Sequence, residues 1–344
     1  MIILGLESSA DKLGVGIISS EGKILANLRK TYKPPRGSGV LPREASEHHA
    51  RNIPELIKKA LEEAKLLPHE IDLIAFTRGC GMGPCLRVAA VAGRTLSSQL
   101  KKPLIGVNHQ IGHIEIGRLV TGFKDPVVLY VSGGNTQLIA YTEGRYRVFG
   151  ETLDIPIGNC LDVFGREAGL SDKDAPMGRV VELLAKKTDE YVPLPYVVKG
   201  MDLSFSGILT ATLKKLREGI SVEVLANSLQ ETVFAMLTEV TERALSHTKK
   251  DEILVTGGVA ANTRLKEMLN QMAIEHGAKF AGLPAPLAID NGVMIARAGY
   301  LMWNTGQRPR AEDFLVDQHF RVEDVEVTWR SNSSKARIAQ IGSS

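Results

Sequence analysis

The chain has 344 residues, of which 44% are hydrophobic and 24% are charged, and its formal net charge is +3 at pH 7. This balance is typical of a globular protein with two domains or one large α/β unit, and it excludes a chain that is disordered over most of its length. The mild positive charge permits contact with nucleic acid but does not require it.

The N-terminal stretch "MIILGLESSADKLGVGII" predicts a strand that begins almost at the first residue. It lacks a basic leader, and Glu7 and Asp11 interrupt its apolar run, which argues against a signal peptide, a transit peptide and a membrane span. The three cysteines, Cys80, Cys85 and Cys160, have no disulfide or C-x-x-C spacing. We therefore expect a cytoplasmic protein, also nuclear if the source is eukaryotic, with no membrane partner.

Two pairs of segments repeat the same order of elements. Residues 2–27 and 127–150 each predict a meander of three strands whose first turn is built from small residues. Residues 71–100 and 251–277 each predict a strand, a glycine turn and a helix, followed by a short strand and a polar turn. The repetition indicates a duplicated α/β fold of two lobes with a cleft between them.

The expected boundaries follow from this repeat. Residues 1–123 form the N-terminal lobe and residues 124–330 the C-terminal lobe, whose last helix is allowed to pack back on the first lobe. Residues 154–215 have no counterpart in the first half and predict a helical insertion, a common location for specific function. Residues 331–344 form a polar tail.

Two glycine turns follow apolar strands at matching places in the repeat, at Ser132–Gln137 and Thr256–Asn262. Gly133–Gly134 and Gly257–Gly258 allow the backbone to approach an anion such as a phosphate. One such turn is more often a tight turn without a ligand, but the matched pair favours a nucleotide. The chain contains neither G-x-G-x-x-G nor G-x-x-x-x-G-K-[ST], which disfavours a Rossmann dinucleotide site and a P-loop.

The stretch "VNHQIGHIEIG" places His109 and His113 one helical turn apart, so both imidazoles can reach one cation. A bare H-x-x-x-H is more often structural, and no glutamate stands at the position that a zincin protease needs for its general base. The adjacent His48 and His49 point in different directions on a helix and are predicted to be surface or cleft residues. Asp290, between apolar stretches at the start of a helix, either completes a metal site or caps that helix.

Taken together, the motifs identify a family. "PREASEHH", "GCGMGPCLRV", "VNHQIGHIEIG", "LYVSGGNTQLIAY", "GNCLDVFGRE", "LPYVVKGMDLSFSG", "VTGGVAAN" and "AIDNGVMIA" resemble the TsaD/KEOPS family of tRNA threonylcarbamoyltransferases, formerly described as O-sialoglycoprotein endopeptidases. The resemblance is colinear from about Ile2 to Arg321 and looks like the archaeal and eukaryotic cytosolic branch. The chain departs from the family at Met177–Gly178, where paired glycines are usual, and at Cys80, where proline is common.

The resemblance implies an actin-like (ASKHA) α/β fold and an acyltransferase activity. The family transfers a threonylcarbamoyl group from threonylcarbamoyl-AMP to N6 of the adenine that follows the anticodon in tRNAs reading ANN codons, and AMP is released. Two alternatives are an ATP-binding ASKHA scaffold without acyl transfer and a metalloendopeptidase. The missing H-E-x-x-H glutamate argues against the peptidase.

The resemblance also implies the site residues and the partners. One metal ion would be held by His109, His113, Tyr130 and Asp290, and a phenolate ligand suits iron, with zinc, manganese or magnesium as alternatives. Threonylcarbamoyl-AMP or ATP would contact the following residues: Tyr130, Val131, Ser132, Gly133, Gly134, Asn135, Asp162, Gly178, Glu182 and Asn262. No side chain is identified as a general base. The implied partners are tRNA and three KEOPS-type proteins, a small atypical protein kinase, a dimerisation subunit and an accessory subunit.

Overall fold

The computed structural model describes residues 1–35, 38–171, 175–309 and 311–330, so the predicted polar tail 331–344 lies outside the described residues. The chain forms two compact units. The first contains Met1–Leu119, Tyr141–Arg147 and the chain from Asp290 onward, and the second contains Val120–Ala140 and Val148–Ile289. The segment after Asp290 belongs to the first unit, an arrangement that the sequence analysis left open for the last helix of residues 124–330.

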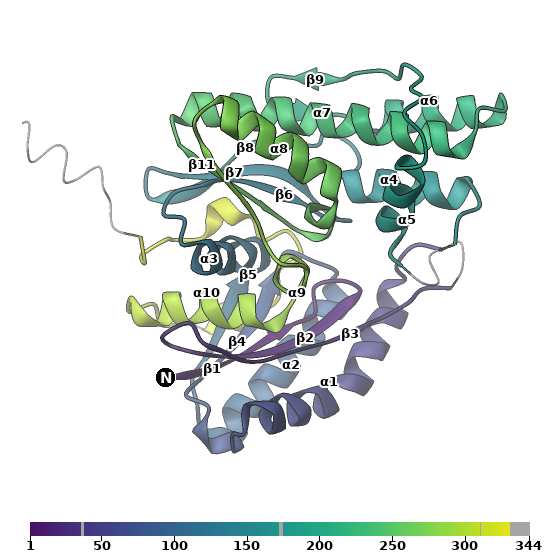
Figure 1. The fold of residues 1–344 in the computed structure, drawn as a ribbon. Helices are drawn as coiled ribbons and strands as arrows, with labels where there is room; N and C mark the ends of the chain where they lie inside the picture. Colours follow the sequence, from purple (N-terminus) through teal and green to yellow (C-terminus); the bar gives the residue numbers. More distant parts are fainter. Residues whose placement is uncertain (36–37, 172–174, 310, 331–344) are drawn as a thin grey trace, which may run out of the picture. The chain divides into compact units, whose positions relative to one another are not determined.

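The first unit is built on a five-stranded mixed sheet in the order β3-β2-β1-β4-β5 (Figure 1). β1 is antiparallel to β2 and parallel to β4, which is in turn parallel to β5. The strands are β1 (Ile2–Glu7), β2 (Lys12–Ser19), β3 (Ile24–Thr31), β4 (Leu73–Gly79) and β5 (Leu104–Asn108).

The second sheet has the strand order β12-β11-β6-β7-β8. β6 is antiparallel to β7 and parallel to β11, which is parallel to β12. The strands are β6 (Val127–Val131), β7 (Thr136–Thr142), β8 (Arg145–Glu151), β11 (Glu252–Thr256) and β12 (Lys279–Gly282). Each sheet is therefore a meander of three strands extended by two parallel strands. The sequence repeat predicts the five strands, and the structure adds their direction and order.

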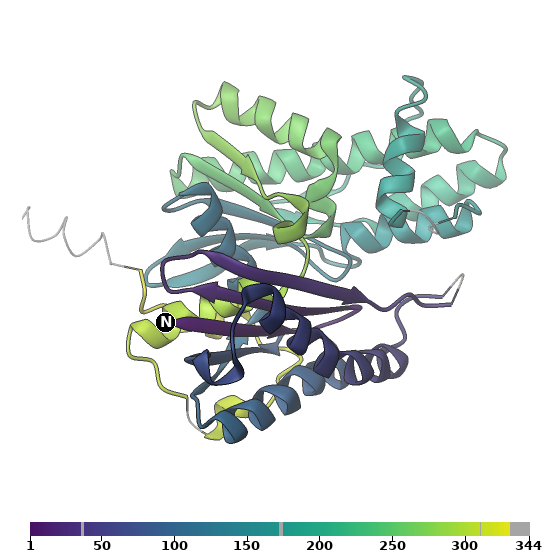
Figure 2. The same cartoon turned by 60° about the horizontal axis from the view of Figure 1, so that its bottom comes forward.

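Helices cover both faces of the first sheet. α1 and α2 lie on one face, and α10 packs on the other with α3 (Figures 1 and 2). The apolar core on the side of α1 and α2 includes Leu6, Val15, Ile53, Phe76 and Ala89. The helices are α1 (Pro42–Ala64), η1 (Pro68–Glu70), α2 (Gly83–Leu100), α3 (His109–Thr121), α10 (Gly292–Asn304), η3 (Ala311–Phe314) and η4 (Val322–Asp324).

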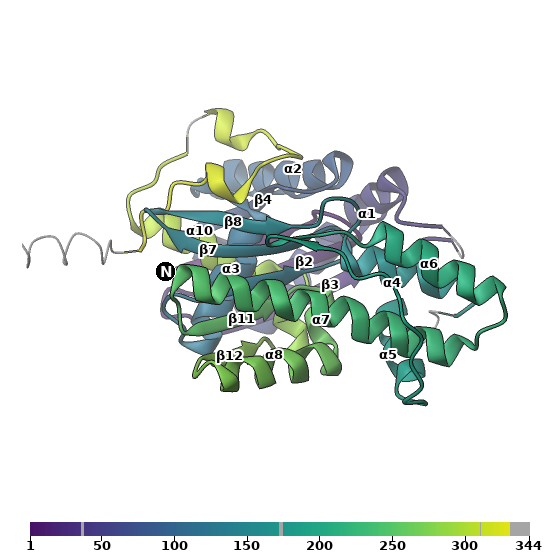
Figure 3. The same cartoon turned by 90° about the horizontal axis from the view of Figure 1, so that it is seen from above.

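In the second unit, the long helix α7 and the helix α8 lie along one face of the sheet (Figure 3). The predicted insertion forms α4, α5, the short β9–β10 hairpin and α6, and its apolar side chains join the core of α7. The elements are α4 (Ile157–Glu167), α5 (Met177–Ala185), β9 (Val198–Lys199), β10 (Asp202–Leu203), α6 (Ser206–Arg217), α7 (Val222–Thr248), η2 (Gly258–Ala261), α8 (Thr263–Glu275) and α9 (Ala285–Ala288). Among the helices that the structure describes, none has the length and apolarity needed to cross a bilayer.

The start of α10 lies directly against the backbone of β1 and β2. A Cβ atom on Gly16 would lie 2.2 Å from the backbone nitrogen of Val293, and one on Gly292 would lie 2.1 Å from the nitrogen of Gly16. Gly5 meets the same helix, because its Cβ would lie 2.0 Å from the carbonyl oxygen of Gly292. Only glycine permits this approach, and the approach sets the position of Asp290, which precedes α10.

Asp154, at the start of the insertion, caps α6 from a distance in sequence. Its carboxylate accepts hydrogen bonds from the amides of Phe205 and Ser206 at 2.9 and 3.1 Å and from the hydroxyls of Ser204 and Ser206. Partial burial raises the pKa of Asp154, but these hydrogen bonds outweigh it and lower the pKa below its usual value. The ionised carboxylate therefore ties the insertion together.

We expect Gly292→Ala to lower the free energy of unfolding by about 3 kcal/mol, because the added methyl meets backbone atoms that cannot rotate away. Denaturant unfolding measures this change. The matched control is Gly207→Ala in α6, whose Cβ would have no atom within 4 Å. There the same change should stabilise by about 0.5–1 kcal/mol, and an equal loss in both variants would contradict the close approach.

We expect Asp154→Asn to lower Tm at pH 7, with a difference from the unchanged protein that shrinks below about pH 4. The folded pKa of Asp154 is depressed, so its contribution is complete above the unfolded pKa of about 3.9 and is lost as the pH falls toward the folded pKa. Thermal unfolding from pH 7 to pH 3 tests this. A difference in Tm that stays constant across the range would contradict it.

Candidate functional site

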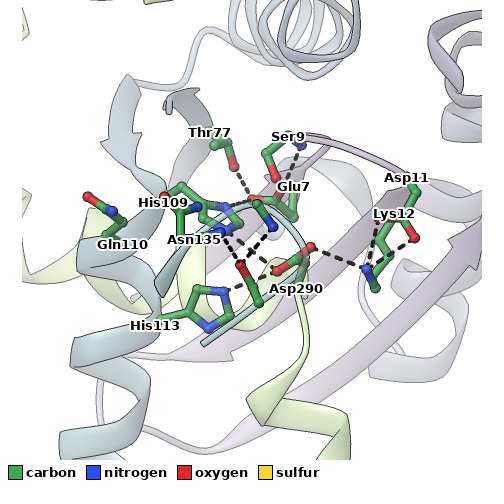
Figure 4. A network of polar contacts seen from close by, with 12 residues as sticks. Glu7, Ser9, Asp11, Lys12, Thr77, His109, Gln110, His113, Asn135 and Asp290 are labelled. Atoms are coloured by element: carbon green, nitrogen blue, oxygen red, sulfur yellow. Dashed lines mark hydrogen bonds and ion pairs between the residues drawn. The ribbon is translucent and has the colours of Figure 1, made fainter. Parts of the chain in front are cut away.

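Three side chains of the first unit converge in a cluster of possible metal ligands. One ligand atom each from His109, His113 and Asp290 lies within 4.8 Å of the others (Figure 4). Asp290 Oδ1 is 3.5 Å from His109 Nε2 and 3.1 Å from His113 Nε2. His113 is fully buried and His109 is 4% exposed. The structure thus brings together three of the four predicted metal ligands.

Local structure explains how these side chains meet. Asn108, the last residue of β5, accepts hydrogen bonds through Oδ1 from the amides of Gln110 and Ile111 and so begins α3 at His109. On the other side, Asn291 caps α10, and its Oδ1 accepts from the amide of Met294 at 2.9 Å. The alternative reading of Asp290 as that helix cap is therefore wrong.

Glu7 is a site residue that the sequence analysis missed. It is fully buried at the end of β1, and its Oε2 lies 3.1 Å from His109 Nδ1. The hydroxyl of Thr77 and the amide of Ser9 also donate to Glu7. Its only signal in the sequence was an acid inside an apolar strand. β1, β4 and β5 are neighbouring parallel strands, so Glu7, Thr77 and His109 meet at the shared carboxyl edge, the usual location of ligand sites in such sheets.

The carboxylate of Glu7 fixes which nitrogen of His109 faces the cluster. An ionised carboxylate only accepts hydrogen bonds, so His109 donates to Glu7 from Nδ1, and Nε2 is the nitrogen that faces Asp290. Burial raises the pKa of Glu7, but the charge of His109 and its hydrogen bond outweigh burial and lower the pKa. His109 Nε2 then lies 3.5 Å from Asp290 Oδ1, and both atom types are common metal ligands.

Lys12 is a second residue that the sequence analysis missed. Its Nζ lies 3.6 Å from Asp290 Oδ2 and 2.9 Å from Asp11 Oδ1. Burial raises the pKa of Asp290, but the Lys12 charge and the hydrogen bonds of both histidines outweigh it and hold the pKa well below its usual range. Burial lowers the pKa of His113. Asp290 therefore stays ionised beside a neutral imidazole, which is the state that binds metal ions.

Tyr130, the predicted fourth ligand, lies near the end of β6 in the second unit and is 2% exposed. The other three ligands belong to the first unit. The assignment of Tyr130 to the metal therefore stays a prediction.

The two predicted glycine turns of the second unit lie side by side. β6 and β11 are parallel neighbours in which Tyr130 pairs with Thr256, so the turns that follow them leave the same edge of the sheet. Gly257 is in the left-handed region with φ +96°, and its Cβ would lie 2.2 Å from the carbonyl oxygen of Val131. The two glycine turns therefore lie next to each other at one edge of the sheet, which is the arrangement expected if both contact the same ligand.

Within the first of these turns, Ser132 organises the backbone. Its hydroxyl accepts from the amides of Gly134 and Asn135 at 3.3 and 3.0 Å, and its carbonyl accepts from the amide of Gly158 in α4. A Cβ on Gly133 or Gly134 would have no atom within 4 Å. The turn is therefore held in shape and has open space beside its glycines.

Two predicted nucleoside contacts also meet in the second unit. Glu182 is 2% exposed and accepts from the amide of Thr263 at 3.1 Å, and Asn262 is the residue before it. Asn262 Oδ1 caps α8 by accepting from the amides of Arg264 and Leu265, and its Nδ2 donates to Gln230. Burial raises the pKa of Glu182, but its hydrogen bonds, from Arg179 first, lower it, so the carboxylate is ionised.

The departure from the family at Met177 is accommodated inside the unit. Met177 is 7% exposed, and its sulfur lies 2.2 Å from where a Cβ on Gly165 of α4 would stand. A Cβ on the neighbouring Gly178 would have no atom within 4 Å. Met177 thus fills the core of the second unit.

Asp162 lies half-buried in α4, and its contact with a nucleoside stays a prediction.

The histidine pair of α1 differs in part from its prediction. His49 is fully buried, with Nε2 2.8 Å from the carbonyl oxygen of Ala10, and its ring lies beside that of His48. The prediction of a surface or cleft residue is wrong for His49, because its ring packs inward against the loop after β1.

Solved structures with this architecture define its class. HypF from Thermococcus kodakarensis matches with a TM-score of 0.63 at 12% identity, over 88% of this chain and 48% of that one. The activator of the 2-hydroxyisocaproyl-CoA dehydratase from Clostridium difficile matches with a TM-score of 0.54 at 10% identity, over 90% of this chain and 100% of that one. The duplicated sheets and these matches show the actin-like α/β fold, so the predicted fold class is confirmed.

Sequence comparison gives the family within this class. Residues 23–297 match the profile of the family TsaD, tRNA N6-adenosine threonylcarbamoyltransferase. Relatives of that name are 50% identical in Methanopyrus kandleri, over 99% of this chain and 100% of the relative, and 50% identical in Xenopus laevis, over 96% and 99%. The chain belongs to the tRNA N6-adenosine threonylcarbamoyltransferases, a family of acyltransferases that act on tRNA. The predicted family, enzyme class and archaeal–eukaryotic branch are confirmed.

Some relatives are longer. A protein of Methanobrevibacter smithii, described as a probable bifunctional tRNA threonylcarbamoyladenosine biosynthesis protein, is 54% identical over 97% of this chain. The chain spans 61% of the length of that relative.

We expect Asn262→Ala to lower the free energy of unfolding by about 1 kcal/mol, because α8 loses its cap. Asn262→Ser should restore most of that stability, since a serine hydroxyl can cap, but it removes the amide that faces Gln230. If Asn262 also contacts the nucleoside, calorimetry should find weaker ATP binding for Asn262→Ser at nearly unchanged Tm. Full ATP affinity in this variant would leave Asn262 as a cap alone.

Proposed function

We propose that this chain transfers the threonylcarbamoyl group of threonylcarbamoyl-AMP to N6 of the adenine that follows the anticodon in tRNAs reading ANN codons, with a metal ion at His109, His113 and Asp290. The observation that carries the proposal is the convergence of these three ligand atoms within 4.8 Å, in a chain about half identical to named transferases. Family membership supports the reaction, and the cluster supports the metal.

The donor set suits a transition metal. Two imidazoles and one carboxylate are common ligands of zinc, iron and manganese, whereas magnesium prefers oxygen ligands. Tyr130 would add a phenolate, which favours ferric iron, and we propose iron on that ground. When bound, the ion supplies a Lewis acid for the threonylcarbamoyl end of the substrate.

The second unit would hold the adenylate. The turn Ser132–Asn135, which the Ser132 hydroxyl holds in shape, has open space beside Gly133 and Gly134 for the phosphate. We assign Glu182 to the ribose hydroxyls, because an ionised carboxylate accepts hydrogen bonds from them. Asp162, Gly178 and Asn262 complete the proposed nucleoside contacts, together with the backbone of residues 130–131.

The proposed transfer does not depend on one catalytic side chain. The N6 amine of the tRNA attacks the carbamoyl carbon, the bond from that carbon to the phosphate oxygen breaks, AMP leaves with its electron pair, and the amine loses one proton to solvent. The turn Ser132–Asn135 would position the phosphate as it departs, and holding both substrates in place supplies much of the rate. No general base is assigned.

We further propose that the reaction occurs in the cytoplasm, and also in the nucleus if the source is eukaryotic, within a KEOPS-type complex. Its partners would be a small atypical protein kinase, a dimerisation subunit and an accessory subunit. The mild net charge of +3 fits a tRNA substrate that partner proteins also help to hold.

His109→Ala/His113→Ala should abolish stoichiometric metal and reduce threonylcarbamoyladenosine formation by at least 100-fold, because two of three ligands in the cluster are removed. Elemental analysis of the purified protein measures the metal, and mass spectrometry of digested tRNA measures the product after incubation with threonylcarbamoyl-AMP.

The matched control is His69→Ala, which removes a histidine from the exposed turn η1 and should retain both properties. Metal content that survives in the double variant would remove the ligand assignment. ATP binding by the unchanged protein without any product, in the presence of its partners, would favour a nucleotide-binding scaffold.

A further inference from the structure

The C-terminal segment contacts α3, the helix that carries both histidines, on the side away from the metal ligands. Residues 313–330, here named the strap, pass over α2 and beside β4 in the first unit (yellow in Figure 3). In this stretch the structure describes two short 3-10 turns and no strand. The strap is therefore held mainly by individual hydrogen bonds and by buried apolar side chains.

The body of the strap is fixed along β4 and the turn that follows it. The amide of Asp317 donates to the carbonyl of Arg78 at 2.9 Å, and the Arg78 guanidinium pairs with Asp313 at 2.7 Å. Gln318 accepts from the amide of Gly83, at the start of α2, at 3.1 Å. These contacts give the strap a defined path.

The far part of the strap is anchored by small apolar side chains. Val322, Val325 and Val327 are 1%, 5% and 6% exposed. The carbonyl of Glu326 accepts from Gln307, which follows α10. The strap therefore reaches Trp329 as an ordered segment.

The strap touches α3 at both ends of the part that bears the histidines. At the start of the helix, Asn108 caps α3 through Oδ1 and donates through Nδ2 to the carbonyl of Phe320 at 2.9 Å. Further along, the indole nitrogen of Trp329 donates to Glu115 Oε1 at 2.8 Å. The segment from residue 109 to 115 thus lies between two strap contacts.

Hydrogen bonds to Glu115 can hold the orientation of α3. Residues in an α-helix turn by about 100° each, so Glu115 lies about 200° from His113, on the opposite side. Glu115 is 1% exposed and also accepts from Tyr146 Oη at 2.6 Å and from Arg118 at 2.7 Å. Burying a carboxylate is costly unless several donors satisfy it, and here the two donors from outside α3, Tyr146 and Trp329, fix the helix from the side away from the metal ligands.

The donors are themselves packed together. The Arg330 guanidinium lies 3.9 Å from the ring centre of Tyr141 and 5.5 Å from that of Tyr146. Arg330, the last described residue of the strap, thereby stacks on Tyr141 of β7 and on Tyr146 of β8, the tyrosine that donates to Glu115. The hydrogen bond of Trp329 and the cation–π contacts of Arg330 thus fix this end of the strap.

We propose that Trp329 and Glu115 form a latch by which the strap sets the orientation of α3, and with it the distances from His109 and His113 to Asp290. Both are positioning residues, since neither touches the metal ligands. This inference rests on the metal centre of the proposed function. Groups that hydrogen-bond directly to metal ligands typically change metal affinity by 10- to 100-fold, so a latch that acts through the helix is expected at the lower end of this range.

The test uses the full chain, freed of metal, and Co²⁺ as the probe, because its visible absorption bands report ligand geometry. Trp329→Phe keeps an aromatic ring and removes the donor to Glu115. We expect Co²⁺ to bind about tenfold more weakly to this variant, with altered bands. Glu115→Gln, which removes the charge, should show the same direction of change, and Trp329→Phe alone suffices if Glu115→Gln does not fold.

The matched control is Trp303→Phe in α10, whose ring contacts Arg308 at 3.7 Å. It should bind Co²⁺ like the unchanged protein. If the unchanged protein binds Co²⁺ and Trp329→Phe binds it with the same affinity and spectrum, the latch is overturned and the metal centre stands. If the unchanged protein binds no Co²⁺, the metal centre and the latch both fall.

Discussion

The approach of α10 to the backbone of β1 and β2 is the contact on which the candidate site depends. Glycines at positions 5, 16 and 292 let the backbones meet, since a Cβ on any of them would lie within 2.2 Å of a backbone atom. Asp290 immediately precedes α10, so the contact delivers a carboxylate from late in the chain to histidines from its first third. The site is thus a consequence of backbone packing more than of any local motif.

A second constraint is the shared carboxyl edge of three parallel strands. Glu7, Thr77 and His109 come from separate segments and meet because β1, β4 and β5 run in the same direction. Glu7 fixes the donor nitrogen of His109, and Lys12 keeps Asp290 ionised. The ligands are therefore oriented and charged by groups that do not ligate, as is common around protein metal sites.

Much of the fold could be predicted from the chain because a repeat of apolar strands and glycine turns is a local pattern. The meanders, the parallel extensions and the helical insertion all follow from it, and the two sheets have the same strand order. His109 and His113 could be paired because one helical turn separates them. Glu7 and Lys12 were missed, since one acid and one lysine near a strand carry no spacing that indicates a metal site.

The sequence by itself determined the family, the duplicated architecture and the two histidines, because these depend on residues close together along the chain. The sequence left open whether the last helix packs on the first lobe and whether Asp290 caps α10. Only the tertiary structure decided that the segment after Asp290 packs with the first unit, that Asn291 is the cap, and that His49 is buried. It also revealed the hydrogen bond from Trp329 to Glu115, two residues that are 214 positions apart in the sequence. Contacts over such separations depend on how backbones approach each other, and no local pattern of residue types records that approach.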